Sequence, residues 1–448
     1  MDETIRSLPE ALHSSVRAAW SRLPEPNRQE LVDLIPYLSR DLPGTKDLLA
    51  RVVQNFSTAL GQEKNTIALV GPANVGKSTL YNQLITCQDD RAEVSPVPGT
   101  TRVSRASDAG LFTVMDTPGA DAVGLAGEQV GQIAMQSARA ADFLVIIFKA
   151  PHGIKRAERA LHDELVALGK PCVVVLNKID LVPARDRERV MAAAAQNLGI
   201  DRSQVIETVA TDGTNVARVV LAIAEMEPGL LTALADALPQ YRARLAWQRI
   251  VPTAAAAATV AFVPLPLADI VPLLALQTGM VLTIARIYGY EVTLKRGKEL
   301  IATFGMGFLA RSAYRELSKF MGLPGWMLSS AIAASGTVAM GYAAMTWFSR
   351  GERPSRAALA KMMRDMTLYL KERLSLWPNA PHDMAALREQ ITAALRDLPE
   401  HLVPRPKEVA LSAGRGSSPA GASEGSPGAD ESLQYPVPPG RPYRHGPD

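Results

Sequence analysis

The residues GPANVGKS at positions 71–78 have the types and spacing of a phosphate-binding loop. They follow the apolar run TIALV and precede a stretch with helical character, which is the usual setting of such a loop. Gly71 and Gly76 allow backbone amides to curl around phosphate oxygens, and the following helix adds the positive end of its dipole. Lys77 is placed to reach the β- and γ-phosphates, and the Ser78 hydroxyl is placed to ligate magnesium.

Two more motifs in the next part of the chain fit a nucleotide with a γ-phosphate. The sequence DTPG ends an apolar run, so that Asp116 can hold magnesium through water and the Gly119 amide can contact the γ-phosphate. Between the loop and DTPG lies PGTTR at 98–102. A threonine of this motif can close over magnesium once a γ-phosphate is present.

The motif NKID at 177–180 selects the base. Asp180 can accept two hydrogen bonds from the N1 and N2 groups of guanine, and adenine offers no such donor pair. Asn177 and Lys178 are expected to pack the base and to tie back to the phosphate loop. The four motifs, in this order, predict a GTP-binding domain.

A fifth stretch, TVATDGTN at 208–215, is similar to the S-A-x-x-G loop that contacts the base. Val209 replaces the usual serine, and Ala210 keeps the backbone contact. The expected GTP contacts are Gly71, Asn74, Val75, Gly76, Lys77, Ser78, Thr79, Asp116, Gly119, Asn177, Lys178, Asp180 and Ala210.

Short apolar runs position these motifs. TIALVG, GLFTVMDTPG, ADFLVIIF and KPCVVVLNKID each end in turn residues and alternate with helical stretches such as RAERALHDELVALG. Continuous apolar strands that alternate with helices predict a mostly parallel sheet covered on both faces. The predicted fold is therefore an α/β P-loop NTPase G domain over residues 63–227.

The four motifs resemble those of the Era/TrmE-like bacterial GTPases over roughly residues 66–225. The resemblance implies that Thr101, more than Thr100, is the switch threonine that binds Mg²⁺ together with Ser78 and Asp116. Many GTPases place a catalytic glutamine where this chain has Ala120.

The TrmE-like branch instead uses an asparagine at the fourth loop position to bind K⁺ beside the phosphates, and Asn74 holds that position here. The alternative is that Asn74 only shapes the turn. The expected catalytic residues are Asn74, Lys77 and Thr101.

The bulk composition excludes several classes of protein. The 448 residues suffice for two or three domains, and a net charge of +3 gives no nucleic-acid signal. Cys87 and Cys172 suggest neither a disulfide framework nor a zinc site. The six histidines, His152 among them, are scattered without ligand spacing, so surface positions are expected for them. A hydrophobic share of 47% is high for a soluble chain with a polar tail.

Two regions account for this hydrophobicity. Residues 326–348 are long enough to span a bilayer, which takes about 20 apolar residues, and tryptophans flank them. Small residues recur at every fourth position, which permits close helix contact: Ser329, Ala333, Thr337 and Gly341. The first region, 251–285, predicts either a hairpin that dips into the bilayer or two buried helices of a soluble bundle.

The expected organisation therefore has five parts. An N-terminal helical segment covers 1–62, followed by the G domain at 63–227 and an all-α, membrane-associated domain at 228–350. Amphipathic helices cover 351–403, and a Ser/Gly/Pro-rich tail covers 404–448. The stretch PLPLADIVPLLALQTGMVLTIARIYG resembles the YcjF-like C-terminal domain that is found fused to bacterial GTPases.

The predicted function is a GTPase that hydrolyses GTP to GDP and phosphate as a switch at the cytoplasmic face of the bacterial inner membrane. The expected cofactors are Mg²⁺ and K⁺. The expected partners are GTP and GDP, membrane lipids, an unidentified protein effector and a second G domain. One alternative is a soluble cytoplasmic GTPase of ribosome assembly, although no G-x-x-G loop in a K-homology context follows the G domain. The other is a dynamin-like membrane remodeller.

Overall fold

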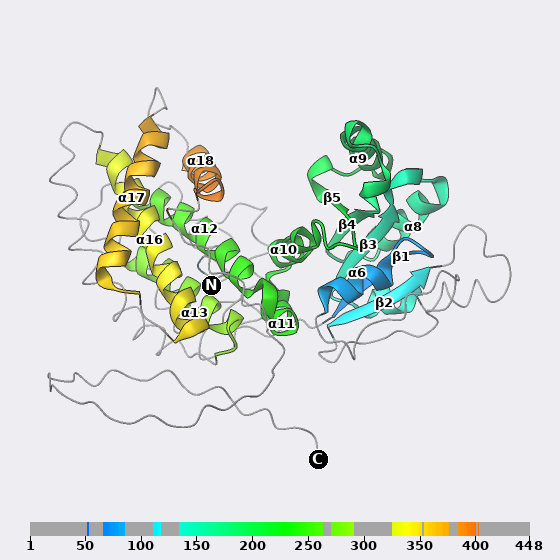
Figure 1. The fold of residues 1–448 in the computed structure, drawn as a ribbon, viewed down its shortest axis with the longest axis horizontal. Coiled ribbons are helices and arrows are strands. Elements are labelled where there is room, and N and C mark those ends of the chain that lie inside the picture. The colour runs from blue at the N-terminus through cyan, green and yellow to red at the C-terminus, as the bar shows by residue number, and fades with distance from the viewer. Residues whose placement is uncertain are drawn as a thin grey trace, which may run out of the picture.

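The computed structural model describes residues 52, 66–85, 111–117, 134–262, 270–290, 325–351, 354–375, 384–399 and 402. Among these residues, five parallel strands form one sheet in the order β2-β1-β3-β4-β5 (Figure 1). The strands are β1 (Ile67–Pro72), β2 (Phe112–Thr117), β3 (Phe143–Lys149), β4 (Cys172–Asn177) and β5 (Val205–Thr208). The four runs that the sequence identified are β1 to β4, so that prediction is confirmed.

The alternation of apolar side chains gives the sheet two buried faces. Ile67 and Leu69 point into the core that includes α6 and α10, whereas Ala68 and Val70 point into the core that includes α8 and α9. The helices are α6 (Lys77–Leu84), α8 (Arg156–Val166), α9 (Ala184–Leu198) and α10 (Val216–Met226). Helices on both faces of a parallel sheet confirm the predicted fold class.

The sheet order brings the chemically interesting loops together. The order reverses at β1, which lies between β2 and β3, and ligands of open α/β sheets bind outside the carboxyl ends of strands at such a point. Asp116 pairs with Gly71 in the register of β1 and β2, and Thr208 pairs with Asn177 in that of β4 and β5. The loops after β1, β4 and β5 therefore share one edge.

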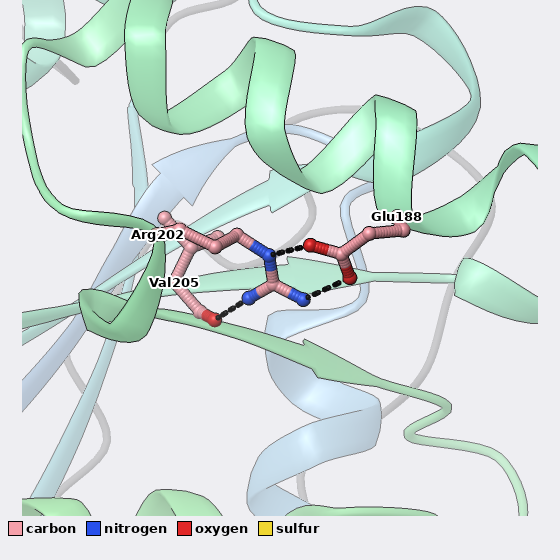
Figure 2. A network of polar contacts seen from close by, with 3 residues as sticks. All are labelled: Glu188, Arg202 and Val205. Atoms are coloured by element: carbon pink, nitrogen blue, oxygen red, sulfur yellow. Dashed lines mark hydrogen bonds and ion pairs between the residues drawn. The ribbon is translucent and has the colours of Figure 1, made fainter.

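Strand β5 is held in place by one guanidinium group (Figure 2). Arg202 donates to both carboxylate oxygens of Glu188 on α9, at 3.0 and 2.9 Å, and to the carbonyl oxygen of Val205 at 3.1 Å. The hydrogen bonds from Arg202 also hold the pKa of Glu188 below its usual range. This bidentate pair fixes the start of the strand whose end reaches the site.

The second half of the chain is helical and lies beside the sheet, with α10 and α11 between the two (Figure 1). Its helices are α11 (Leu231–Ala237), α12 (Arg242–Val260), α13 (Ile270–Ile287), α16 (Gly325–Arg350), α17 (Arg356–Ser375) and α18 (Met384–Arg396). Short 3₁₀ turns are η2 (Ala150–His152), η3 (Ile179–Leu181), η4 (Arg202–Gln204), η5 (Pro228–Leu230) and η6 (Pro239–Tyr241). The two amphipathic helices predicted after Arg350 are confirmed as α17 and α18.

Helix α12 begins before the uncharged stretch that the sequence marked. Its first two turns contain arginines, but Leu245, Ala246 and Ile250 are buried at helical spacing, so one helix continues through the change in composition. The helix that contains the start of the 251–285 region therefore begins at Arg242, within the arginine-containing stretch before it. The loop after α12 and the N-terminal segment 1–62, apart from Val52, lie outside the described residues.

The small residues of α16 allow α12 to approach closely, as predicted. A Cβ atom on Gly341 would lie 2.6 Å from the Cγ1 atom of Ile250, and the Ser329 hydroxyl donates to the carbonyl oxygen of Ala261 at 2.6 Å. The apolar core around α12 and α16 is continuous with the α6 and α10 side of the sheet. The helical half is thus packed onto the sheet domain through α10 and α11.

Candidate nucleotide-binding site

The phosphate loop joins β1 to α6 in a conformation that needs glycine at two positions. A Cβ atom on Gly71 would lie 2.2 Å from the carbonyl oxygen of Ile147, and Gly76 has a φ of 100°. Gly76 is the N-cap of α6 and supplies no side-chain hydrogen bond to it. The first amide groups of α6 can therefore serve an anionic ligand.

Lys77 lies folded over this loop. Its side chain is buried, and its ammonium group donates to the carbonyl oxygens of Gly71 at 2.8 Å and Pro72 at 2.5 Å. A fixed positive charge at the N-terminus of a helix suits phosphate oxygens. Ser78 and Thr79 occupy the first turn of the same helix, beside the loop, and both are half-buried.

Asn177, at the end of β4, connects three parts of the site. Its Nδ2 donates to the carbonyl oxygen of Val75 in the phosphate loop at 2.8 Å. Its Oδ1 accepts from the amide of Ala210 at 3.0 Å and from the hydroxyl of Thr208 at 3.2 Å. Only 1% of Asn177 is exposed, so these hydrogen bonds are shielded from water. The predicted tie from NKID to the phosphate loop is confirmed.

Lys178 makes a second tie from the same motif. With a left-handed φ of 63°, it places its ammonium group 2.8 Å from the carbonyl oxygen of Asn74, to which it donates. Burial and the nearby ammonium of Lys149 lower its pKa, while the Asp180 carboxylate acts in the opposite direction. Asp180 itself is exposed in η3, open to a ligand beside the loop.

The base-contacting loop after β5 is closed by its own backbone. Val209 pairs with Thr214 in an antiparallel bridge, and Gly213 has a positive φ of 80°. Val209, which stands where the motif has serine, is 93% buried and packs into the core that includes α8 and α9. The valine therefore has a packing role that a serine would fill less well.

The sequence did not single out two residues that hold this loop. Thr208 binds Asn177, and Gln83 on α6 donates from Nε2 to the carbonyl oxygen of Thr211 at 3.0 Å. Thr208 is the first residue of the stretch TVATDGTN, directly before the position of the usual serine, but it was given no role. Gln83 offered no signal, because its partner lies 128 residues further along the chain.

Some predicted site residues lie near the end of a described range or outside the described residues. Asp116 falls at the end of β2 opposite Gly71, which places its backbone beside the phosphate loop. Thr101 and Gly119 lie outside the described residues, as does Ala120. Their roles stay predictions, as do those of all the site residues above.

One expectation about histidine was wrong. His162 was expected at the surface, but only 3% of it is exposed, because it lies on the inner face of α8. His152 is exposed as expected.

Cys172 is half-buried at the start of β4, and burial raises the pKa of its thiol. Cys172 packs against the core that includes α8 and α9, which fits a structural residue.

Comparison with protein families now decides the class of this site. Residues 66–178, which contain the phosphate loop, Asp116 and the Asn177 connection, match the family described as 50S ribosome-binding GTPase. Residues 66–178 are a GTPase domain. Residues 229–372 match a second family, described as a domain of unknown function (DUF697), which covers α11 to most of α17.

Curated relatives of the GTPase domain are known by name. The tRNA modification GTPase MnmE of a Nostoc species is 28% identical over 279 residues, which cover 54% of this chain and 60% of that protein. The GTPase Der of Pseudothermotoga lettingae is 29% identical over 230 residues, covering 48% of this chain and 50% of Der. The chain thus spans about half the length of these relatives.

Among solved structures, Era of Aquifex aeolicus bound to GDP and aluminium fluoride is similar at 23% identity, with a TM-score of 0.32. The match covers 43% of this chain and 68% of Era. A score this low supports no further argument. The family match and the MnmE and Der relatives establish a GTPase domain of the Der and MnmE type, which binds GTP and GDP, and GTPases of this family use Mg²⁺.

Proposed function

We propose that this chain hydrolyses GTP to GDP and phosphate as a switch at the cytoplasmic face of the bacterial inner membrane. The observation that carries the enzymatic part is the Asn177 connection, which holds the phosphate loop, the NKID motif and the base loop at one edge of the sheet. Lys77 would bind the phosphates, Ser78, Thr101 and Asp116 would hold Mg²⁺, and Asp180 would read guanine. The division of the chain into five parts, with the G domain at 63–227 and the membrane-associated domain at 228–350, is also proposed.

We also propose that a K⁺ ion supplies positive charge during hydrolysis, because Ala120 stands where many GTPases have a catalytic glutamine. Asn74 has a left-handed φ of 63°, and its side chain is exposed at the loop. The backbone of Asn74 already serves the turn and the bond from Lys178, which leaves the side-chain oxygen for an ion. Such an ion would stabilise charge that builds up on the phosphates in the transition state.

Hydrolysis should therefore be roughly tenfold or more faster in potassium than in sodium at matched ionic strength. Asn74→Gly should remove the difference, because glycine keeps the left-handed turn and lacks the side-chain oxygen. Steady-state phosphate release in each salt measures both. If Asn74→Gly keeps the stimulation, the asparagine serves only the turn and the potassium proposal fails.

The membrane part of the proposal is supported by α16 and by the placement of arginines. Within the described ranges, α16 is the one helix long and apolar enough to cross a bilayer, with a mean hydropathy of 1.2 over its best window, although 89% of that window is buried in the protein. Arg242 and Arg350 both lie close to Tyr288, and Arg242 pairs with Asp236 of α11 at 3.2 Å. The basic end of the bundle thus adjoins the GTPase domain, as the positive-inside rule requires of a cytoplasmic side.

Fractionation of the full chain tests this location. A membrane-bound chain should stay in the pellet through high salt and alkaline carbonate and should leave only with detergent. If the chain is found in the soluble fraction without detergent and does not bind added vesicles, the helical half is a soluble effector bundle, as its burial would allow. GTPase activity that rises with protein concentration on liposomes would instead favour a self-assembling membrane remodeller. We also propose that the chain binds an unidentified effector protein and that its G domain forms a homodimer.

A further inference from the structure

The apolar helix α16 is enclosed by helices of two different kinds. α12 and α13 contact it and carry no charged residue over 250–260 and 270–285. α17 also packs along it, but this helix has five basic and two acidic residues among its 20. The side of α17 that faces the core holds Thr367 within a stripe of apolar residues, namely Met362, Met363, Met366, Leu370 and Leu374.

One buried hydrogen bond joins these two helices and shows their register. The hydroxyl oxygens of Ser335 and Thr367 lie 2.7 Å apart, and neither residue is more than 3% exposed. Helices α16 and α17 are in contact and run side by side in opposite directions (Figure 1). Lys371 and Arg373 therefore lie beside the N-terminal half of α16, far from its basic end.

This register conflicts with burial of α16 in a bilayer. If α16 inserted with α17 attached, Lys371, Glu372 and Arg373 would enter the hydrocarbon region, where charged side chains are strongly unfavourable. If α16 and α17 separate, each of the two helices suits a different depth of the same membrane. α16 suits the acyl chains, and α17 has the apolar stripe and basic opposite face of a helix that lies among headgroups.

We propose that α17 is a removable cover over α16 and that the chain binds a lipid bilayer only after these two helices separate. This proposal rests on the membrane location proposed above, and it names α16 and the apolar stripe of α17 as the surfaces that contact lipid. Methionines dominate the covering stripe, and their flexible side chains pack adequately on more than one partner. The same stripe can thus contact α16 in the closed bundle and acyl chains in the open one.

A reversible disulfide across the two helices tests the proposal. The variant Ser335→Cys with Thr367→Cys, in a chain with Cys87→Ala and Cys172→Ala, places two sulfurs where the oxygens are 2.7 Å apart, near the S–S bond length of about 2.05 Å. The full chain is mixed with vesicles of phosphatidylethanolamine and phosphatidylglycerol, oxidised or reduced, and the bound fraction is measured by sedimentation. GTP binding by both forms confirms that the GTPase domain of each is folded.

The reduced form should bind the vesicles, and oxidation should weaken binding by at least about tenfold, because the competent state is removed. Equal binding by both forms overturns the removable cover and leaves the membrane location standing. If neither form binds while the GTPase domain is folded, the membrane location itself fails.

A second variant removes dependence on the disulfide. Thr367→Val keeps the shape of the side chain, loses the hydrogen bond to Ser335 and should increase vesicle binding. Thr392→Val on α18 is the matched control, because that hydroxyl bonds only to the carbonyl oxygen of Arg388 within its own helix among the contacts observed. If Thr367→Val binds vesicles no better than Thr392→Val does, the cover is not what limits lipid binding and the proposal is wrong.

Discussion

Asp180→Asn should lower the affinity for GTP by roughly 10⁴-fold and raise the affinity for xanthosine triphosphate. The carboxylate of Asp180 offers two acceptors to the N1 and N2 groups of guanine, and asparagine replaces one acceptor with a donor. Xanthine has a carbonyl group where guanine has its amino group, so the new donor finds a partner there. Competition of both nucleotides against a labelled guanine nucleotide measures the exchange of preference.

Asp163→Asn is the matched control for this substitution. Asp163 is an exposed carboxylate near the C-terminal end of α8 in the same domain, and α8 begins after the end of β3 and leads away from it. Its neutralisation changes the net charge as Asp180→Asn does and should leave both affinities unchanged. Equal affinities of the native chain for GTP and ATP would refute the assignment of Asp180 to the base.

The sheet was predictable because its strands are buried on both faces. A strand covered by helices on two sides must be apolar along its whole length, so TIALV, FLVII and CVVVL stand out without any alternation. β5 escaped because it has only four residues and includes Glu207, half-buried near one end. Its identity as a strand depends on pairing with β4 and on the bond between Arg202 and Glu188 of α9, and both tie it to other elements of the fold.

The site was predictable where motifs carry their own chemistry and not where contacts depend on the tertiary fold. The type and spacing of Asn177 and Lys178 pointed to the phosphate loop, and the hydrogen bonds are there. The burial of His162 could not be predicted from the spacing of the histidines. It depends on which face of α8 packs toward the sheet, and His162 lies on that face.

The nature of α16 shows where composition reaches its limit. A helix that is apolar on all sides is required both at the centre of a soluble bundle and in a bilayer. The sequence of residues 326–348 meets both requirements, and the structure encloses them with α12, α13 and α17. What separates the two outcomes is whether α17 stays in place, which is a free-energy difference between states and not a property of one segment.

Asn177→Ala should weaken GTP binding by about 100-fold, equal to about 3 kcal/mol. The alanine leaves three buried groups without their partner: the carbonyl oxygen of Val75, the amide of Ala210 and the hydroxyl of Thr208. Each unsatisfied buried group costs about 1–3 kcal/mol unless the loops shift to reach water. Such a shift would displace the phosphate loop and the base loop together, because this one side chain joins them.

Thr208→Val separates this connection from simple loss of packing. Valine keeps the shape of threonine and removes one donor, while the bonds of Asn177 to Val75 and Ala210 remain. The affinity for GTP should then fall by less than about tenfold, since one neutral hydrogen bond contributes about 1 kcal/mol. Isothermal titration with GTP and GDP, alongside thermal unfolding of each variant, measures binding apart from stability. If Asn177→Ala binds GTP as tightly as Thr208→Val does, the two loops are positioned independently and Asn177 does not connect them.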